Sequence, residues 1–120
     1  MRYVAILAVL ALISGGAAMA QTSAQVERGR YLVEGIAGCG NCHTPNGPTG
    51  KVANMALAGG LMEDNKAFRA VAASITPDRE TGIGTWTDAE IGRALREGIS
   101  RDWRVMGPPM PFELYRAMSD

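Results

Sequence analysis

Apolar residues recur at helical spacing in two stretches of the chain. The first predicts a helix from Val26 to Ala37, because its apolar positions lie three or four residues apart and charged side chains fill the positions between them. Gly38 follows, as is typical of a helix C-terminus. The second predicts a helix that begins after Thr87 and ends at Gly98, with a stripe formed by Ile91, Ala94 and Leu95.

The start of the second helix carries a capping signal. In Thr87-Asp88-Ala89-Glu90, the threonine hydroxyl and the glutamate carboxylate are spaced to bond backbone N–H groups that the first helical turn leaves unpaired. Between the helices, residues 39–50 are rich in glycine and proline and predict a loop, and Gly59-Gly60 predicts a turn. No stretch shows the apolar–polar alternation of a strand. The expected fold is therefore all-α, with few helices and long loops.

The first twenty residues form a separate segment. Arg2 gives a positive start, residues 4–13 are an apolar run, and Ala18 and Ala20 are the small residues that a signal peptidase reads. An apolar run of this length is too short for a membrane-spanning helix, which needs about 20 residues. We therefore expect a secretory signal peptide over residues 1–20, cleaved after Ala20, and an exported domain over residues 21–120.

Composition and charge narrow the possible functions. The chain has 120 residues, which suits one domain, and its 12 Lys and Arg balance its 12 Asp and Glu. This neutrality gives no electrostatic case for nucleic-acid binding, which needs a strongly basic surface. The chain contains only two cysteines and one histidine. Any thiol or imidazole chemistry must therefore use Cys39, Cys42 and His43.

These three residues form the C-x-x-C-H pattern of c-type haem attachment, over Cys39-Gly40-Asn41-Cys42-His43. Thiols at this spacing can form thioethers with the two vinyl groups of one porphyrin, and the next residue then places its imidazole beneath the ring, at the iron. A structural zinc site needs four ligands, and the chain has no second Cys/His pair. The pattern thus predicts one covalently bound haem c, with His43 as the proximal ligand.

Two other classes of protein remain as alternatives. An exported thiol–disulfide oxidoreductase would also use Cys39 and Cys42, but it would carry them at a helix N-terminus after a strand of a parallel sheet. A haem sensor or a peroxidase would leave the distal side of the iron open. The sequence shows no parallel sheet before Cys39, which counts against the first alternative, and the second stays open.

Coordination of the iron by two histidines is excluded, because no second histidine exists to serve as the sixth ligand. Methionine and histidine ligation raises the reduction potential and suits electron transfer. Met110 is favoured because Pro108, Pro109 and Pro111 restrict the backbone around it, and Met106 is the alternative. The other candidates outside the signal segment are Met55, Met62 and Met118.

Taken together, the motifs resemble class I c-type cytochromes, and more narrowly the cytochrome c domains of bacterial membrane-associated alcohol and aldehyde dehydrogenases. The resemblance covers nearly the whole exported domain and rests on the following segments: Gly29 with Tyr31, Cys39 to His43, Ile75-Thr76-Pro77-Asp78, Gly82-Ile83-Gly84, Trp86 and Pro109-Met110-Pro111. It implies a few helices around one haem c, thioethers at Cys39 and Cys42, and His43 and Met110 as axial ligands.

The resemblance also implies a function, and the chain departs from the family pattern at two points. It implies a periplasmic carrier without substrate chemistry of its own, which passes electrons from a dehydrogenase partner toward quinone or a terminal oxidase, with peripheral association to a membrane complex. The family usually has an asparagine where this chain has Ser74, and it ends in a helix that crosses the first helix. Because the chain stops at Asp120, we expect a domain truncated at its C-terminus.

Four arginines gather on and after the second helix. Acidic residues are interleaved with them, so a solvated helix face explains the pattern most simply, and a docking patch for an acidic partner is the alternative. Trp103 lies in the same stretch, and its place in a core or at the haem stays open. The four arginines are Arg93, Arg96, Arg101 and Arg104.

Overall fold

The computed structural model describes residues 23–119, which form two compact units that meet in sequence at Cys39 and Gly40. The predicted signal peptide, residues 1–20, lies outside the described residues. Each unit has its own local structure.

The first unit is helical, as the periodicity predicts. Residues 23–30 are α-helical, and the helix widens to π geometry over Tyr31–Ile36 (η1). The Ala37 N–H then donates to the Leu32 carbonyl at 2.8 Å, which is the i to i−5 pairing of a π turn. Gly38 ends the helix in the left-handed region, at φ 57°. The predicted helix from Val26 to Ala37 is confirmed.

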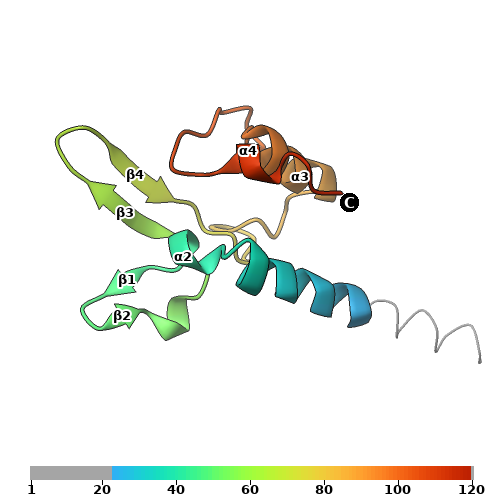
Figure 1. Ribbon diagram of the computed structural model, residues 1–120, viewed down its shortest axis with the longest axis horizontal. Helices are drawn as coiled ribbons and strands as arrows, with labels where there is room; N and C mark the ends of the chain where they lie inside the picture. Colours follow the sequence, from blue (N-terminus) through green and yellow to red (C-terminus); the bar gives the residue numbers. More distant parts are fainter. Residues whose placement is uncertain (1–22, 120) are drawn as a thin grey trace, which may run out of the picture. The chain divides into compact units, whose positions relative to one another are not determined.

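The second unit begins with a short helix and two hairpins (Figure 1). Helix α2, Gly40–His43, is a single turn, and a 3₁₀ turn, η2 (Ala53–Met55), follows the first hairpin. Both hairpins are antiparallel pairs. Their strands are β1 (Asn46–Gly47) with β2 (Gly50–Lys51), and β3 (Gly60–Asp64) with β4 (Arg69–Ala72).

The two hairpins show that the expected all-α fold is wrong. The sequence did not predict the β3–β4 pair. A register shift between Leu61 and Glu63 breaks the strict alternation of apolar and polar residues by which a strand is recognised. Its turn is held by Asn65, whose Oδ1 accepts the Ala67 and Phe68 N–H groups at 2.8 and 3.1 Å. The β1–β2 hairpin is too short to leave any pattern, so the prediction of a plain loop over residues 39–50 was also wrong.

The capping box is confirmed. The Thr87 side chain accepts the Glu90 N–H at 3.2 Å, and Glu90 Oε2 accepts the Thr87 N–H at 2.8 Å. Helix α3 then runs over Asp88–Glu97 and ends at Gly98, whose φ is 70°. A Cβ at Gly98 would lie 2.7 Å from the Phe112 ring, so helix α4, Phe112–Tyr115, packs closely on the end of α3 (Figure 1).

Within residues 23–119 the side chains build little apolar interior. Ala70 is the one apolar side chain that is buried, at 8% exposure, and the buried polar residues are Thr44 and Ser100. Many large apolar side chains are at least half exposed, among them Val26, Ile36, Leu61, Val71, Trp103, Val105 and Leu114. No helix in this part of the chain is long and apolar enough to cross a membrane.

Candidate haem attachment site

The C-x-x-C-H residues lie at the start of the second unit. Cys39 is the last residue of the first unit, and Cys42 and His43 lie on α2. Both cysteines are half-buried thiols. Cys42 and His43 are consecutive residues of this single helical turn. The backbone of the turn therefore sets the direction of the histidine side chain relative to the second thiol.

The His43 imidazole is held by a distant backbone carbonyl. Its Nδ1 lies 2.7 Å from the oxygen of Ala73, the residue that follows β4. Because a carbonyl oxygen only accepts, Nδ1 carries the proton of this hydrogen bond. In the neutral imidazole, Nε2 then keeps its lone pair. This is the arrangement that a histidine ligand of a metal usually shows, because the outer hydrogen bond fixes the tautomer and the ring orientation.

The backbone around His43 is tied to two other segments. The Gly59 N–H donates to the His43 carbonyl at 2.7 Å, and the Leu57 N–H donates to the Thr44 hydroxyl at 3.0 Å. Lys51 Nζ donates to the carbonyls of Asn41 and Thr44, at 2.5 and 3.0 Å. Thr44 is only 8% exposed. These bonds hold the exit from α2 in one conformation.

Gly59 allows this arrangement because it has no side chain. Its φ is 76°, and a Cβ there would lie 2.5 Å from the Ala72 oxygen and 2.6 Å from the Ala73 carbonyl carbon. The backbone at the end of β4, which leads into the Ala73 carbonyl, thus passes directly over Gly59. The sequence predicted a turn at Gly59-Gly60, but in the structure Gly60 already begins β3.

The two candidate methionines for the distal side lie on either side of Gly107. Both side chains are half-buried. The Met106 N–H donates to the Gly98 carbonyl at 2.7 Å, which ties that residue to the end of α3. Met110 follows Pro108 and Pro109, which are joined by a cis peptide bond, and it directly precedes Pro111 and α4. The structure thus places His43 on α2 and Met110 in the loop before α4, and their use as a ligand pair stays a prediction.

The Thr76 to Trp86 loop is a rigid turn. Asp78 Oδ1 accepts the Glu80 N–H at 3.0 Å and the N–H and hydroxyl of Thr81 at 2.7 and 2.8 Å. These bonds, the Thr81 N–H above all, lower the pKa of the Asp78 carboxyl below its ordinary value. Ser74, which stands where the resembled family has asparagine, places its hydroxyl 2.9 Å from the Thr76 hydroxyl. Ser74 thereby joins this loop.

These residues fit a haem. The thiols and the oriented imidazole are the donor set that haem c requires. Part of the exposed apolar surface fits as well, because a chain that surrounds a large apolar group does not bury that surface against its own side chains. When covered, apolar surface contributes about 25 cal/mol per Å².

The structural context does not fit the thiol–disulfide alternative. In such enzymes the cysteine pair follows a strand of a parallel sheet. Here a helix precedes Cys39, and both sheets within residues 23–119 are antiparallel hairpins.

The sequence did not predict the residues that hold His43 and its backbone, which are Ala73, Gly59, Leu57, Thr44 and Lys51. Only the glycine at 59 carried a signal of its own, the Gly-Gly pair.

Sequence similarity to known proteins bears on the class of protein to which the chain is related. No protein-family model matches the chain. The chain is 44% identical over 99 residues to a nicotinate dehydrogenase subunit of Pseudomonas putida, and the match covers 82% of the chain and 8% of that relative. It is 34% identical over 113 residues to the cytochrome c subunit of the quinone alcohol dehydrogenase of Gluconobacter oxydans, covering 92% of the chain and 22% of the relative.

A third relative extends the comparison. The chain is 32% identical over 118 residues to the cytochrome c subunit of gluconate 2-dehydrogenase of Pantoea cypripedii, and the match covers 93% of the chain and 25% of the relative. The chain therefore spans a quarter or less of the length of these three proteins.

Proposed function

The chain is homologous to cytochrome c subunits of bacterial dehydrogenases, and from this premise we propose that it is a periplasmic monohaem c-type cytochrome. It carries electrons from a dehydrogenase partner toward quinone or a terminal oxidase, and it has no substrate chemistry of its own. The observation that carries the proposal is the C-x-x-C-H motif with its histidine already oriented by the bond from Nδ1 to the Ala73 carbonyl.

The residues of the chain have separate tasks in this function. When bound, haem c supplies an iron that alternates between Fe³⁺ and Fe²⁺. Cys39 and Cys42 hold the group through thioethers. His43 presents Nε2 to the iron, and the Ala73 carbonyl keeps the ring in one orientation, so little has to rearrange when the charge changes. Met110 supplies a thioether on the distal side, which favours Fe²⁺.

The test is the covalent retention of haem by the exported protein. The full chain is produced in bacterial cells that contain the haem-attachment machinery, and the periplasmic fraction is analysed by pyridine haemochrome spectroscopy. We expect the spectrum of a haem with two thioether links and one haem per chain. A periplasmic protein with two titratable thiols and no haem would refute the proposal, and disulfide-reductase activity of that protein would then favour the thiol–disulfide alternative.

Replacing Met110 is expected to open the distal side of the iron. Haem-loaded Met110→Ala should lose the far-red charge-transfer band of methionine-ligated Fe³⁺ and should have a lower reduction potential, since a thioether ligand raises it. Absorption spectra and a redox titration measure both effects. Met106→Ala is the matched control and should keep the band. The reverse pattern would make Met106 the ligand, and the absence of the band in the unaltered protein would favour a sensor or peroxidase with an open iron.

A further inference from the structure

The turn after α3 presents an exposed tryptophan. Trp103 is 72% exposed, and its neighbour Val105 is 75% exposed. The Trp103 backbone adopts a φ of 63°, in the left-handed region, which is uncommon and unfavourable for a large side chain. Packing within the chain does not explain why an unfavourable backbone conformation is adopted at a ring that is exposed to solvent.

The conformation of this turn is fixed by Ser100. This residue is 3% exposed, and its hydroxyl lies 2.5 Å from Asp102 Oδ1 and accepts the Arg104 N–H at 3.1 Å. Its N–H donates to the Arg104 carbonyl at 3.0 Å, and its carbonyl accepts the Trp103 N–H at 3.0 Å. Because these bonds close the turn in one arrangement, Trp103 is ordered before any partner binds. Binding then costs less conformational entropy.

One face of the ring is covered by a cation. The Arg93 guanidinium carbon lies 4.0 Å from the centre of the Trp103 ring, and its Nη2 donates to the Ser100 carbonyl at 3.2 Å. Arg93 therefore braces the ring from the α3 side and leaves its other face open. This pairing places positive charge next to an exposed aromatic surface.

Next to Trp103 lies a pocket of about 390 Å³, lined by Trp86, Arg101, Asp102 and Arg104. Arg101 is oriented in it by Thr85, whose hydroxyl it meets at 2.8 Å, and by Glu90 at 3.5 Å. With Arg93 against the Trp103 ring, three guanidinium groups lie around the pocket and the ring, against the two carboxylates of Asp102 and Glu90. The pocket therefore suits the carboxylate of an aspartate or glutamate.

The geometry points to a docking surface for an acidic redox protein, formed by Trp103, Val105 and the arginine-lined pocket. We call it the Trp103 surface. The inference rests on the proposed electron-transfer function, and it deepens that function by naming the surface and the partner chemistry. The partner presents apolar contacts that cover Trp103 and a carboxylate that enters the pocket. Tryptophan and arginine are the residues that most often dominate such interfaces, and opposite charge speeds the encounter.

The Trp103 surface is also placed for electron transfer by chain continuity. From Val105 the backbone runs through Met106, which is anchored to the Gly98 carbonyl, into the segment that contains Met110. The proposed distal ligand and the proposed docking turn thus belong to one continuous segment between α3 and α4. A partner bound at the turn contacts the segment that would cover the distal side of the haem.

The first experiment measures binding with rubredoxin, a small acidic one-electron carrier, in its zinc-substituted form. It is titrated into the reduced, haem-loaded, ¹⁵N-labelled full chain, and the two indole N–H signals are followed by NMR. A Trp103→Phe variant assigns the signals. We expect the Trp103 and Trp86 signals to shift with added rubredoxin and to return when the salt concentration is raised. Unmoved indole signals under saturating rubredoxin would overturn the inference.

The second experiment measures electron transfer by stopped flow. Iron rubredoxin passes from Fe²⁺ to Fe³⁺ as the haem iron of this chain passes from Fe³⁺ to Fe²⁺, so one electron moves and no bond breaks. We expect the second-order rate constant to fall about tenfold in Arg104→Glu at low ionic strength and by about the same factor in Trp103→Ala.

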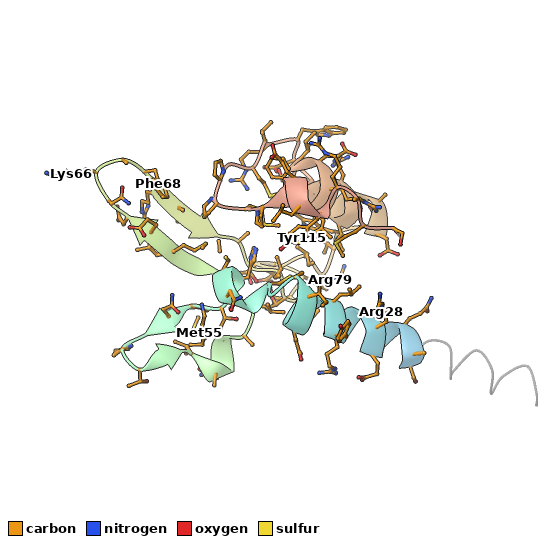
Figure 2. All side chains as sticks on the ribbon, viewed as in Figure 1. Arg28, Met55, Lys66, Phe68, Arg79 and Tyr115 are labelled. Atoms are coloured by element: carbon orange, nitrogen blue, oxygen red, sulfur yellow. The ribbon has the colours of Figure 1, made fainter. Side chains whose placement is uncertain are left out.

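Matched controls come from the β3–β4 hairpin. Lys66 lies at its tip and Phe68 directly before its second strand, and both side chains are exposed (Figure 2). Lys66→Glu and Phe68→Ala carry the same kinds of change and should leave the rate within about twofold of the unaltered protein. Equal rates for all four haem-loaded variants would overturn this inference alone, whereas an exported protein without haem would overturn the proposed function.

Discussion

The double variant Cys39→Ala/Cys42→Ala is expected to lose all covalently held haem. A haem without thioethers is retained only by axial ligation and apolar contacts, and denaturation releases it. The apolar side chains that the haem covers would then be exposed to solvent, so we also expect less folded protein in the periplasm. Haem staining of a denaturing gel, together with a pyridine haemochrome spectrum, measures the loss directly.

Asn41→Ala provides the control for the cysteine variant. Asn41 lies between the two cysteines on α2, and its side chain is exposed. The Asn41 contact with Lys51 uses the backbone carbonyl, which the substitution keeps. This variant should therefore stain for haem as strongly as the unaltered protein does. Covalent haem in the double cysteine variant would contradict the proposed attachment site.

Gly59→Ala is expected to destabilise the haem-loaded protein by about 2 to 4 kcal/mol. Part of this cost comes from the positive φ of residue 59, which is 76°. The rest comes from the new Cβ, which would press on the backbone of Ala72 and Ala73. Because Ala73 holds His43 Nδ1, displacement of this strand should also alter the absorption spectrum of the histidine-ligated iron. Chemical denaturation followed by absorption measures both effects.

Two other glycines separate these causes. Gly50 also has a positive φ, at 114°, but no atom lies within 4 Å of the position of its Cβ, so Gly50→Ala should cost only about 1 to 2 kcal/mol. Gly107 has open space and no positive φ, so Gly107→Ala should stay within about 0.5 kcal/mol of the unaltered protein. An equal or smaller loss of unfolding free energy in Gly59→Ala than in Gly50→Ala would contradict the claim that glycine is needed at residue 59 because the backbone of Ala72 and Ala73 passes close to it.

The parts of the fold that the sequence predicted depend on short-range interactions. Thr87 and Glu90 are three residues apart, so their reciprocal hydrogen bonds form as soon as the first turn of α3 forms. Gly38 and Gly98 end their helices because each adopts a positive φ that other residues avoid. Neither feature needs a contact from elsewhere in the chain.

The hairpins could not be predicted in the same way. Strand pairing joins residues that alternate between two faces, and the irregular register between Leu61 and Glu63 removes that alternation from the sequence. The sheet is also too small for burial to impose a pattern, since Ala70 is its one buried side chain. The expectation of an all-α chain was therefore wrong at the hairpins, where the sequence shows no regular pattern of apolar and polar residues.

The sequence by itself determined the donor set that we propose, because thioether attachment and imidazole ligation, as predicted, depend on residue identity and on spacing within Cys39 to His43. Only the tertiary structure decided what orients that histidine. Its partner, the Ala73 carbonyl, belongs to the backbone and lies thirty residues away in sequence, so no side-chain pattern marks it. The same holds for Trp103, since a positive φ held by Ser100 arises from how the turn closes and not from the tryptophan itself.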